Sequence, residues 1–178
     1  GKVNGKYRFD PQELLSHISK SMPLFTEDNS PNMVFKPPKT FLQPLRLDID
    51  LQLKDEHVLD LKLCANFTRA VTEFVREIVQ KDDVRYVIVK KPEGYWDKVK
   101  GKDVFKVGFH AYFPGTTMDL STALECGERA VSLVRDHFGT LDFLNLDEDV
   151  VDSSVTGRSN GLMMLGDHKP YKHGRPCG

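Results

Sequence analysis

Two aspartates stand two residues apart in a segment of alternating character. Residues 45–53 read Leu-Arg-Leu-Asp-Ile-Asp-Leu-Gln-Leu, so apolar and polar side chains take turns along the whole run. This pattern predicts a β-strand with one buried face. Successive side chains of a strand point to opposite faces, so Asp48 and Asp50 share the polar face, roughly 6–7 Å apart at their Cα atoms.

Two carboxylates at this separation repel each other and shift each other's pKa unless a cation lies between them. A hard divalent cation with oxygen ligands meets that need. An ordinary solvated strand face can carry the same two acids, so the segment predicts a metal site only together with other residues.

A second alternating segment spans residues 105–113, where Lys106, Gly108, His110 and Tyr112 share the polar face. We expect Gly108 to leave open space beside His110 for the approach of a ligand. If both polar faces line one cleft, Lys106 and His110 offer donors to a phosphate while the carboxylates hold its metal. Considered alone, a strand histidine is more often a surface or core residue.

The third segment covers residues 151–169. Asp152 follows an apolar pair and is a candidate third carboxylate, and several glycines in the segment permit tight turns. Lys169 comes just past a predicted strand, in a position to reach an anion. The same stretch is also compatible with an acidic, glycine-rich surface loop.

Other local patterns predict the elements that must position these residues. The chain order is strand–helix–strand–strand–helix–strand–strand, with connections too short for two domains, which favours one α+β domain of mixed sheet and helices. The predicted elements are a helix from the cap at Asp10 to about Met22, a loop at 23–44, an amphipathic helix at about 58–80, a short strand at 85–90, a turn-prone stretch at 91–104, a strand at 105–113 ended by Pro114 and Gly115, a helix at about 120–138, and strands at about 149–152 and 161–166.

Composition narrows the class of protein. The 178 residues carry a net charge of −1, which excludes a uniformly basic nucleic-acid binder but not a local basic groove. The three cysteines lie far apart and show no CxxC spacing, so they indicate neither a disulfide framework nor a zinc knuckle. We expect Cys64 and Cys126 to be small core residues in a reducing, intracellular compartment. No apolar run reaches ~18 residues, so no membrane partner is expected.

The order and spacing of the three segments resemble the archaeo-eukaryotic primase superfamily over about residues 41–172. The resemblance is strongest to the N-terminal primase domains of poxvirus-type and asfarvirus-type primase–helicases, and extends to primase-polymerases. The residues that carry it are Leu47-Asp48-Ile49-Asp50 in the first motif, Gly108-Phe109-His110 in the second, and Val151-Asp152 in the third, followed by the run to Lys169.

This resemblance implies a fold of mixed or antiparallel sheets with an RRM-like half, flanked by helices. It also implies one catalytic domain over residues 1–178, with an N-terminal helix and loop at 1–40 and a catalytic core at 41–172. We expect the chain to be a fragment of a longer protein that works with a helicase domain in cis or in trans, at a cytoplasmic viral replication site.

The implied activity is template-directed nucleotidyl transfer that makes RNA or DNA primers on single-stranded DNA. In this reading Asp48, Asp50 and Asp152 are catalytic and hold two Mg²⁺ or Mn²⁺ ions. His110, Lys169 and Lys106 hold the nucleoside triphosphate.

The basic stretch that carries Lys98, Lys100 and Lys102, with Trp96 as a stacking platform, is a candidate surface for the template. A lysine-rich loop is also an ordinary solvated loop.

Two other functions stay open. A catalytically degenerate primase-like module could bind template or assemble with a helicase. A metal-dependent nucleotide-sugar transferase also uses an Asp-x-Asp strand, although that class gives no reason for the His110 strand or for the segment from Asp152 to Lys169.

Overall fold

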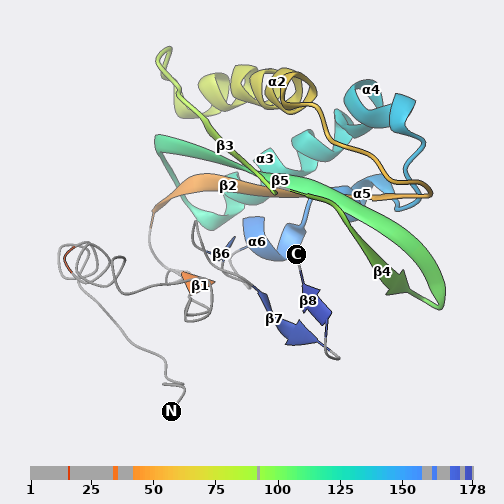
Figure 1. Cartoon of the computed structure of the whole chain (residues 1–178). Coiled ribbons are helices and arrows are strands. Elements are labelled where there is room, and N and C mark those ends of the chain that lie inside the picture. The colour runs from red at the N-terminus through yellow and green to blue at the C-terminus, as the bar shows by residue number, and fades with distance from the viewer. Residues whose placement is uncertain are drawn as a thin grey trace.

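A central antiparallel sheet (Figure 1) contains the two alternating segments at 45–53 and 105–113. Strand β5 (Lys102–Met118) lies in the middle and pairs with β2 (Gln43–Leu53) along one edge. Its other edge pairs with β3 (Val87–Lys90) and with β4 (Tyr95–Val99).

The structure is a computed structural model that describes residues 42–91 and 93–157, together with Ser16 and the backbone of four short strands. These strands are β1 (Val34–Phe35), β6 (Leu162–Met163), β7 (Lys169–Lys172) and β8 (Arg175–Cys177).

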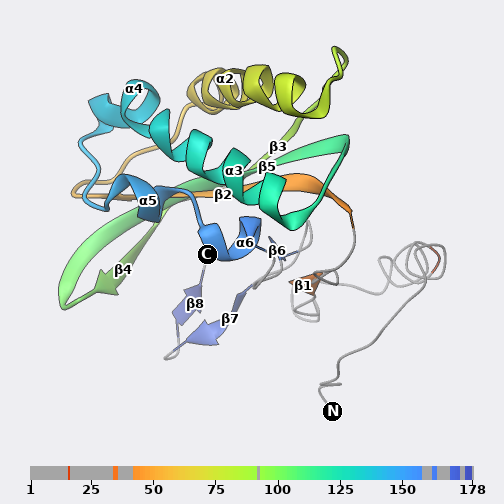
Figure 2. The same cartoon turned by 180° about the vertical axis from the view of Figure 1, so that it is seen from behind.

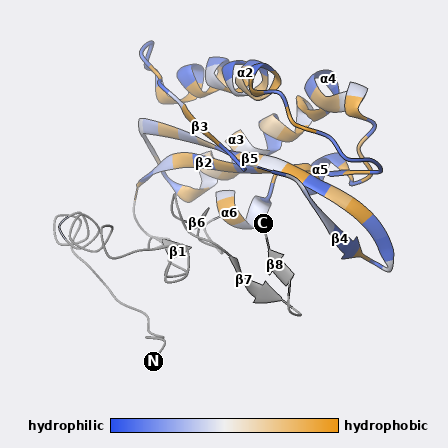
Figure 3. Ribbon diagram, viewed as in Figure 1, coloured by the Kyte–Doolittle hydropathy of each residue, from blue (hydrophilic) through white to orange (hydrophobic). Residues whose placement is uncertain are grey.

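Three helices cover one face of the sheet, as Figures 1 and 2 show: α2 (Leu61–Val79), α3 (Leu120–Ser132) and α4 (Val134–Phe138). The Asp60 side chain caps α2 by accepting from the Lys62 backbone N–H, and Gln80 ends it in the left-handed conformation. Hydrophobic and hydrophilic residues alternate around α2 in Figure 3, as expected of a helix that packs on a sheet. The core holds the apolar face of β2 and β5 against helix residues such as Phe67, Val71 and Phe138.

The outer edge of β2 is covered by residues 144–152 rather than by another regular strand. The Leu144 N–H donates to the Gln52 carbonyl at 2.7 Å, and the Asp152 N–H donates to the Asp48 carbonyl at 2.9 Å. Between these contacts the chain leaves the sheet as the one-turn helix α5 (Asp147–Val150) and returns where Val151 bridges Ile49. Helix α6 (Ser153–Thr156) follows directly. This path brings Asp152 alongside Asp48.

The predicted strand at 45–53 and helix at about 58–80 are confirmed, and so is the α+β class. The turn-prone reading of 91–104 is wrong, because β4 and the start of β5 form a hairpin there. Its turn consists of Lys100 and Gly101, both at positive φ (51° and 82°), which matches the twist of the two strands.

The prediction that Pro114 and Gly115 end the strand is also wrong. Strand β5 runs on to Met118 through a register shift opposite Gln43 and Leu45. Gly115 adopts a φ of 81°, and the Thr116 hydroxyl accepts from the Leu45 N–H at 3.3 Å. A bulge with a side-chain bond therefore takes the place of a strand end.

Two further predictions about elements are corrected. The helix predicted at 120–138 is divided at Leu133 into α3 and α4, where the Ser132 hydroxyl bonds back to the Arg129 carbonyl at 2.7 Å. The strand predicted at 149–152 is wrong apart from the single bridge at Val151. Acidic residues at 147–149 start a helical turn instead, in line with the preference of carboxylates for helix N-termini.

Only Leu162 and Met163 of the strand predicted at 161–166 are described as strand. Apart from Ser16, the predicted N-terminal helix lies outside the described residues. So does most of the predicted loop at 23–44, from which Val34–Phe35 and the start of β2 emerge as strand. Among the described helices, none has both the length and the apolar character to cross a membrane.

Candidate active site

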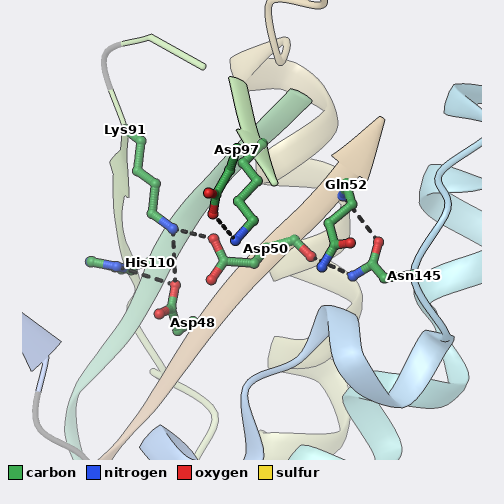
Figure 4. A network of polar contacts seen from close by, with 8 residues as sticks. Asp48, Asp50, Gln52, Lys91, Asp97, His110 and Asn145 are labelled. Atoms are coloured by element: carbon green, nitrogen blue, oxygen red, sulfur yellow. Dashed lines mark hydrogen bonds and ion pairs between the residues drawn. The ribbon is translucent and has the colours of Figure 1, made fainter. Parts of the chain in front are cut away.

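Asp48 and Asp50 both point to the face of β2 that the helices leave uncovered, as the alternation predicted. The ammonium group of Lys91 lies between them (Figure 4). Its Nζ forms an ion pair with Asp50 Oδ1 and lies 3.7 Å from Asp48 Oδ1. Lys91 follows β3, and its backbone N–H donates to the Gly108 carbonyl at 3.2 Å. The register of β3 on β5 thus delivers a cation to the paired carboxylates.

The electrostatics of this cluster favour the charged lysine. The side chain of Lys91 is only 18% exposed, and this burial by itself disfavours the ammonium. The carboxylates of Asp48 and Asp50 outweigh the burial, so the pKa of Lys91 is raised above its usual value.

His110 lies directly opposite Asp48 in the register of β2 and β5. Its Nε2 is 3.2 Å from Asp48 Oδ1, and its side chain is 15% exposed. The prediction that the histidine and the carboxylates share one face of the sheet is therefore confirmed. Tyr112 is next to it on that face, with the ring centroids 6.3 Å apart.

The expectation of open space at Gly108 is wrong. A Cβ atom at this position would overlap the Ile49 carbonyl and come within 2.9 Å of Asp50 Oδ1. Gly108 is opposite Asp50 in the strand register, so its lack of a side chain lets β2 and β5 approach closely beside the carboxylate. The glycine makes room for Asp50 rather than for a ligand.

Asp152 is on the same side of the domain as the other two aspartates, but its carboxylate is engaged locally. Its Oδ1 accepts from the Ser154 N–H at 2.8 Å and from the Ser154 hydroxyl at 2.6 Å, which caps α6. Within residues 42–91 and 93–157, no three His, Cys, Asp or Glu side chains come close enough together to hold one metal ion.

An open pocket of about 260 Å³ connects Asp152 with Asp50. Its lining adds two carboxylates that sequence reasoning missed, Glu148 and Asp149 on α5. The acidic run at 147–152 was visible in the sequence, but the prediction of a strand there hid its role as a pocket wall. The other lining residues are Gln52, Tyr95, Lys106, Val151 and Ser153.

The oxygen donors present suit Mg²⁺ or Mn²⁺. Asp48 and Asp50 already converge on one positive charge, the Lys91 ammonium, and this convergence is the observation that fits a cation site. Asp152 fits as a third ligand only if its carboxylate moves closer to the other two, since no three such side chains among residues 42–91 and 93–157 are close enough to share one ion.

The remaining predicted site residues occupy different surroundings. Lys106 lines the pocket and pairs with Asp97 on β4 at 2.7 Å. Lys169 lies in β7, and its side chain is outside what the structure describes.

The candidate template residues all lie on the β4–β5 hairpin. Lys98 pairs with Asp103 at 3.8 Å, while Lys100 and Lys102 are exposed at or next to the turn. The Trp96 indole donates to Glu56 at 2.8 Å and packs edge-on against Phe105, which leaves the tryptophan 46% exposed.

Sequence reasoning also missed Asn145. Its amide accepts from the Gln52 N–H at 3.0 Å and donates to the Asp50 carbonyl at 2.9 Å (Figure 4). One side chain therefore takes the place of a peptide group along the edge of β2 and fixes the backbone at Asp50. An asparagine in an irregular segment carries no sequence signal for such a role.

The antiparallel sheet with flanking helices, together with a family match, places the chain in the class of archaeo-eukaryotic primase (AEP) domains. The family model described as "C962R protein N-terminal AEP domain" matches residues 2–175, and the chain belongs to this family. AEP domains of this type come from primase–helicases of large DNA viruses. AEP primases are typically nucleotidyltransferases and generally use divalent metals. No curated protein shows a significant match to the chain.

Proposed function

We propose that this domain catalyses template-directed nucleotidyl transfer and synthesises RNA or DNA primers on single-stranded DNA. The observation that supports it most is the arrangement of the three aspartates in a domain of the AEP family. Asp48 and Asp50 converge on one positive charge, the Lys91 ammonium. The Asp152 backbone N–H donates to the Asp48 carbonyl.

Asp48, Asp50 and Asp152 are the residues that would hold two Mg²⁺ or Mn²⁺ ions, with Asp152 released from its cap on α6. When bound, such ions activate the primer 3′-hydroxyl and neutralise the charge of the triphosphate. The protein's own contribution is to hold the carboxylates on a rigid strand, where the amide of Asn145 fixes the backbone at Asp50.

His110, Lys106 and Lys169 are the proposed contacts to the nucleotide. The imidazole of His110 is beside Asp48, so a phosphate bound there lies next to the carboxylates. Lys106 would exchange its pairing with Asp97 for the triphosphate. Lys169→Ala should weaken nucleotide affinity and leave single-strand DNA affinity unchanged, whereas equal losses of both would place this lysine on the template path.

The β4–β5 hairpin is the proposed template surface. It presents Lys98, Lys100 and Lys102 beside an indole that is partly exposed. Bases stack on aromatic rings while lysines follow the phosphates, which suits a single strand of any sequence.

The finer fold and context also belong to this proposal. The sheet order β3–β5–β2–Val151 with α2 and α3 on one face follows the βαββαβ arrangement of an RRM-like half. We infer a single domain over residues 1–178 that acts with a helicase at a viral replication site.

The test is incorporation of labelled ribonucleotides and deoxynucleotides on unprimed and primed single strands, with Mg²⁺ and with Mn²⁺. Asp50→Asn keeps the volume and removes the charge, so it should lower incorporation at least about 100-fold, as expected when a charged group that holds the metal in the transition state is neutralised. Asp83→Asn, which changes an exposed ion pair with Arg85, is the matched control and should retain activity.

Circular dichroism of both variants must match the parent, so that the loss reports on chemistry rather than folding. Binding of single-stranded DNA with no incorporation under any condition would instead assign the domain to the degenerate, non-catalytic alternative.

A further inference from the structure

Lys91 occupies the place that a divalent cation needs. Its ammonium contacts Asp50 Oδ1 directly and lies 3.7 Å from Asp48 Oδ1. A Mg²⁺ ion bound to the same carboxylate oxygen would sit about 2.0–2.1 Å from it. Two positive charges that share one carboxylate oxygen repel each other, so the ammonium and the metal compete for Asp50.

We propose that Lys91 is an internal counter-ion that a divalent metal displaces from Asp50, and that this exchange lowers the metal affinity of the domain. The inference rests on the proposed function, because it takes Asp48 and Asp50 as metal ligands. It adds a residue that no motif of the family resemblance contains and that the sequence grouped with the surface lysines.

The geometry around Lys91 permits such an exchange. Its backbone is fixed by the bond from its N–H to the Gly108 carbonyl, so the residue stays at the end of β3 whatever its side chain does. The four-carbon side chain can swing away from the carboxylates without moving the sheet. In the metal-free domain the ammonium relieves the repulsion between two carboxylates that the strand holds on one face.

Lysine footprinting on the unmodified protein tests the displacement directly. An acetylating reagent is added with and without Mn²⁺, in the absence of nucleotide, and each lysine is followed by mass spectrometry. We expect Lys91 to react slowly without metal, because it is mostly buried and ion-paired, and at least about fivefold faster with saturating Mn²⁺. Lys81, whose ammonium donates to the Gly115 carbonyl on the surface, is the internal control and should react equally in both conditions.

Metal affinity provides the second measurement. Mn²⁺ binding is determined by calorimetry for the parent, Lys91→Met, Lys106→Met and Asp50→Asn. Lys91→Met should bind Mn²⁺ about tenfold more tightly, since the competing charge is gone. Lys106→Met removes the same charge from the pocket that Asp50 lines but not from the Asp50 carboxylate itself, because Lys106 pairs with Asp97, so its effect should be clearly smaller.

The outcomes separate this inference from the proposed function. Mn²⁺ binding that depends on Asp50, with Lys91 equally protected in both conditions, would overturn the inference and leave the function standing. Equal gains in Mn²⁺ affinity from Lys91→Met and Lys106→Met would show that any lost positive charge nearby has the same effect. That result would also overturn the inference. Mn²⁺ binding that Asp50→Asn does not weaken would overturn both. Because the footprinting uses the unmodified protein, it tests the displacement of Lys91 even if Lys91→Met fails to fold.

Discussion

At the scale of single residues, the contact between His110 and Asp48 links the two strands that carry the first two motifs. If His110 holds a nucleotide phosphate, His110→Ala removes a charge-assisted hydrogen bond worth about 1.5–3 kcal/mol. We expect kcat/KM for the nucleotide to fall about 10–100-fold, with a higher KM and a lower kcat. Steady-state incorporation kinetics measure both, and the exposed His57→Ala is the control. Unchanged kinetics would make His110 a structural residue.

Gly108 gives a prediction of stability rather than of chemistry. In Gly108→Ala the new methyl group meets Asp50 Oδ1 and the Ile49 carbonyl, and the carbonyl cannot retreat easily because it belongs to the backbone of a paired strand. Overpacking of this kind costs about 1–3 kcal/mol in the free energy of unfolding. Urea denaturation measures the loss. Gly139→Ala, where nothing lies within 4 Å and φ is negative, should cost far less.

The sequence was informative about residues wherever a pattern of period two fixed the direction of a side chain. Alternation alone placed Asp48 and Asp50 on one face of their strand and His110 on the polar face of its own strand. Lys91 could not be singled out in the same way, because it is one of several lysines between 90 and 102 and only the register of β3 on β5 selects it. The role of Gly108 was misjudged for a similar reason, since the atoms that fill its space belong to a distant strand.

At the scale of elements, Asn145 holds the edge strand in place of a backbone partner. Asn145→Ala leaves the Gln52 N–H and the Asp50 carbonyl without this partner in a part-buried position. We expect a loss of about 2 kcal/mol in the free energy of unfolding, measured in urea. Asn145→Asp keeps an acceptor for Gln52 but sets a carboxylate oxygen against the Asp50 carbonyl, so it should cost more than the loss of the donor alone. A neutral Asn145→Ala would contradict this role.

Prediction of elements succeeded for long periodic segments and failed where short segments met turns. The alternation of β2 and the helical periodicity of α2 each extend over many residues, so both were predicted correctly. The hairpin of β4 and β5 was missed because its lysines suggested a solvated loop. Residues 149–152 were predicted as a strand, although the carboxylates at 147–149 favour a helix start.

At the scale of the whole molecule, two buried thiols should make the free energy of unfolding decrease at alkaline pH. Burial raises the pKa of Cys64 and of Cys126 from 9.0 to about 11. Above about pH 9 the thiols of the unfolded chain ionise while those of the folded chain stay neutral, so the unfolded state is favoured. The contribution is complete below pH 9 and is lost progressively towards pH 11, by about 2–3 kcal/mol for each thiol.

Urea unfolding at pH 8 to 10.5 measures this loss. Cys64→Ala and Cys126→Ala should each show a shallower decline with pH than the parent, even though each is less stable at pH 8 because of the cavity it creates. Parallel declines in the parent and both variants would assign the alkaline sensitivity to other groups.

The excursion of the chain between Leu144 and Val151 has a consequence for how this domain tolerates insertions. Both ends of the excursion are bonded to β2, and the side chain of Asn145 spans the gap between them. The number of residues in the detour is therefore not dictated by the spacing of the sheet. A short peptide inserted there would extend this wall of the pocket, while the strand that carries Asp48 and Asp50 stays where it is.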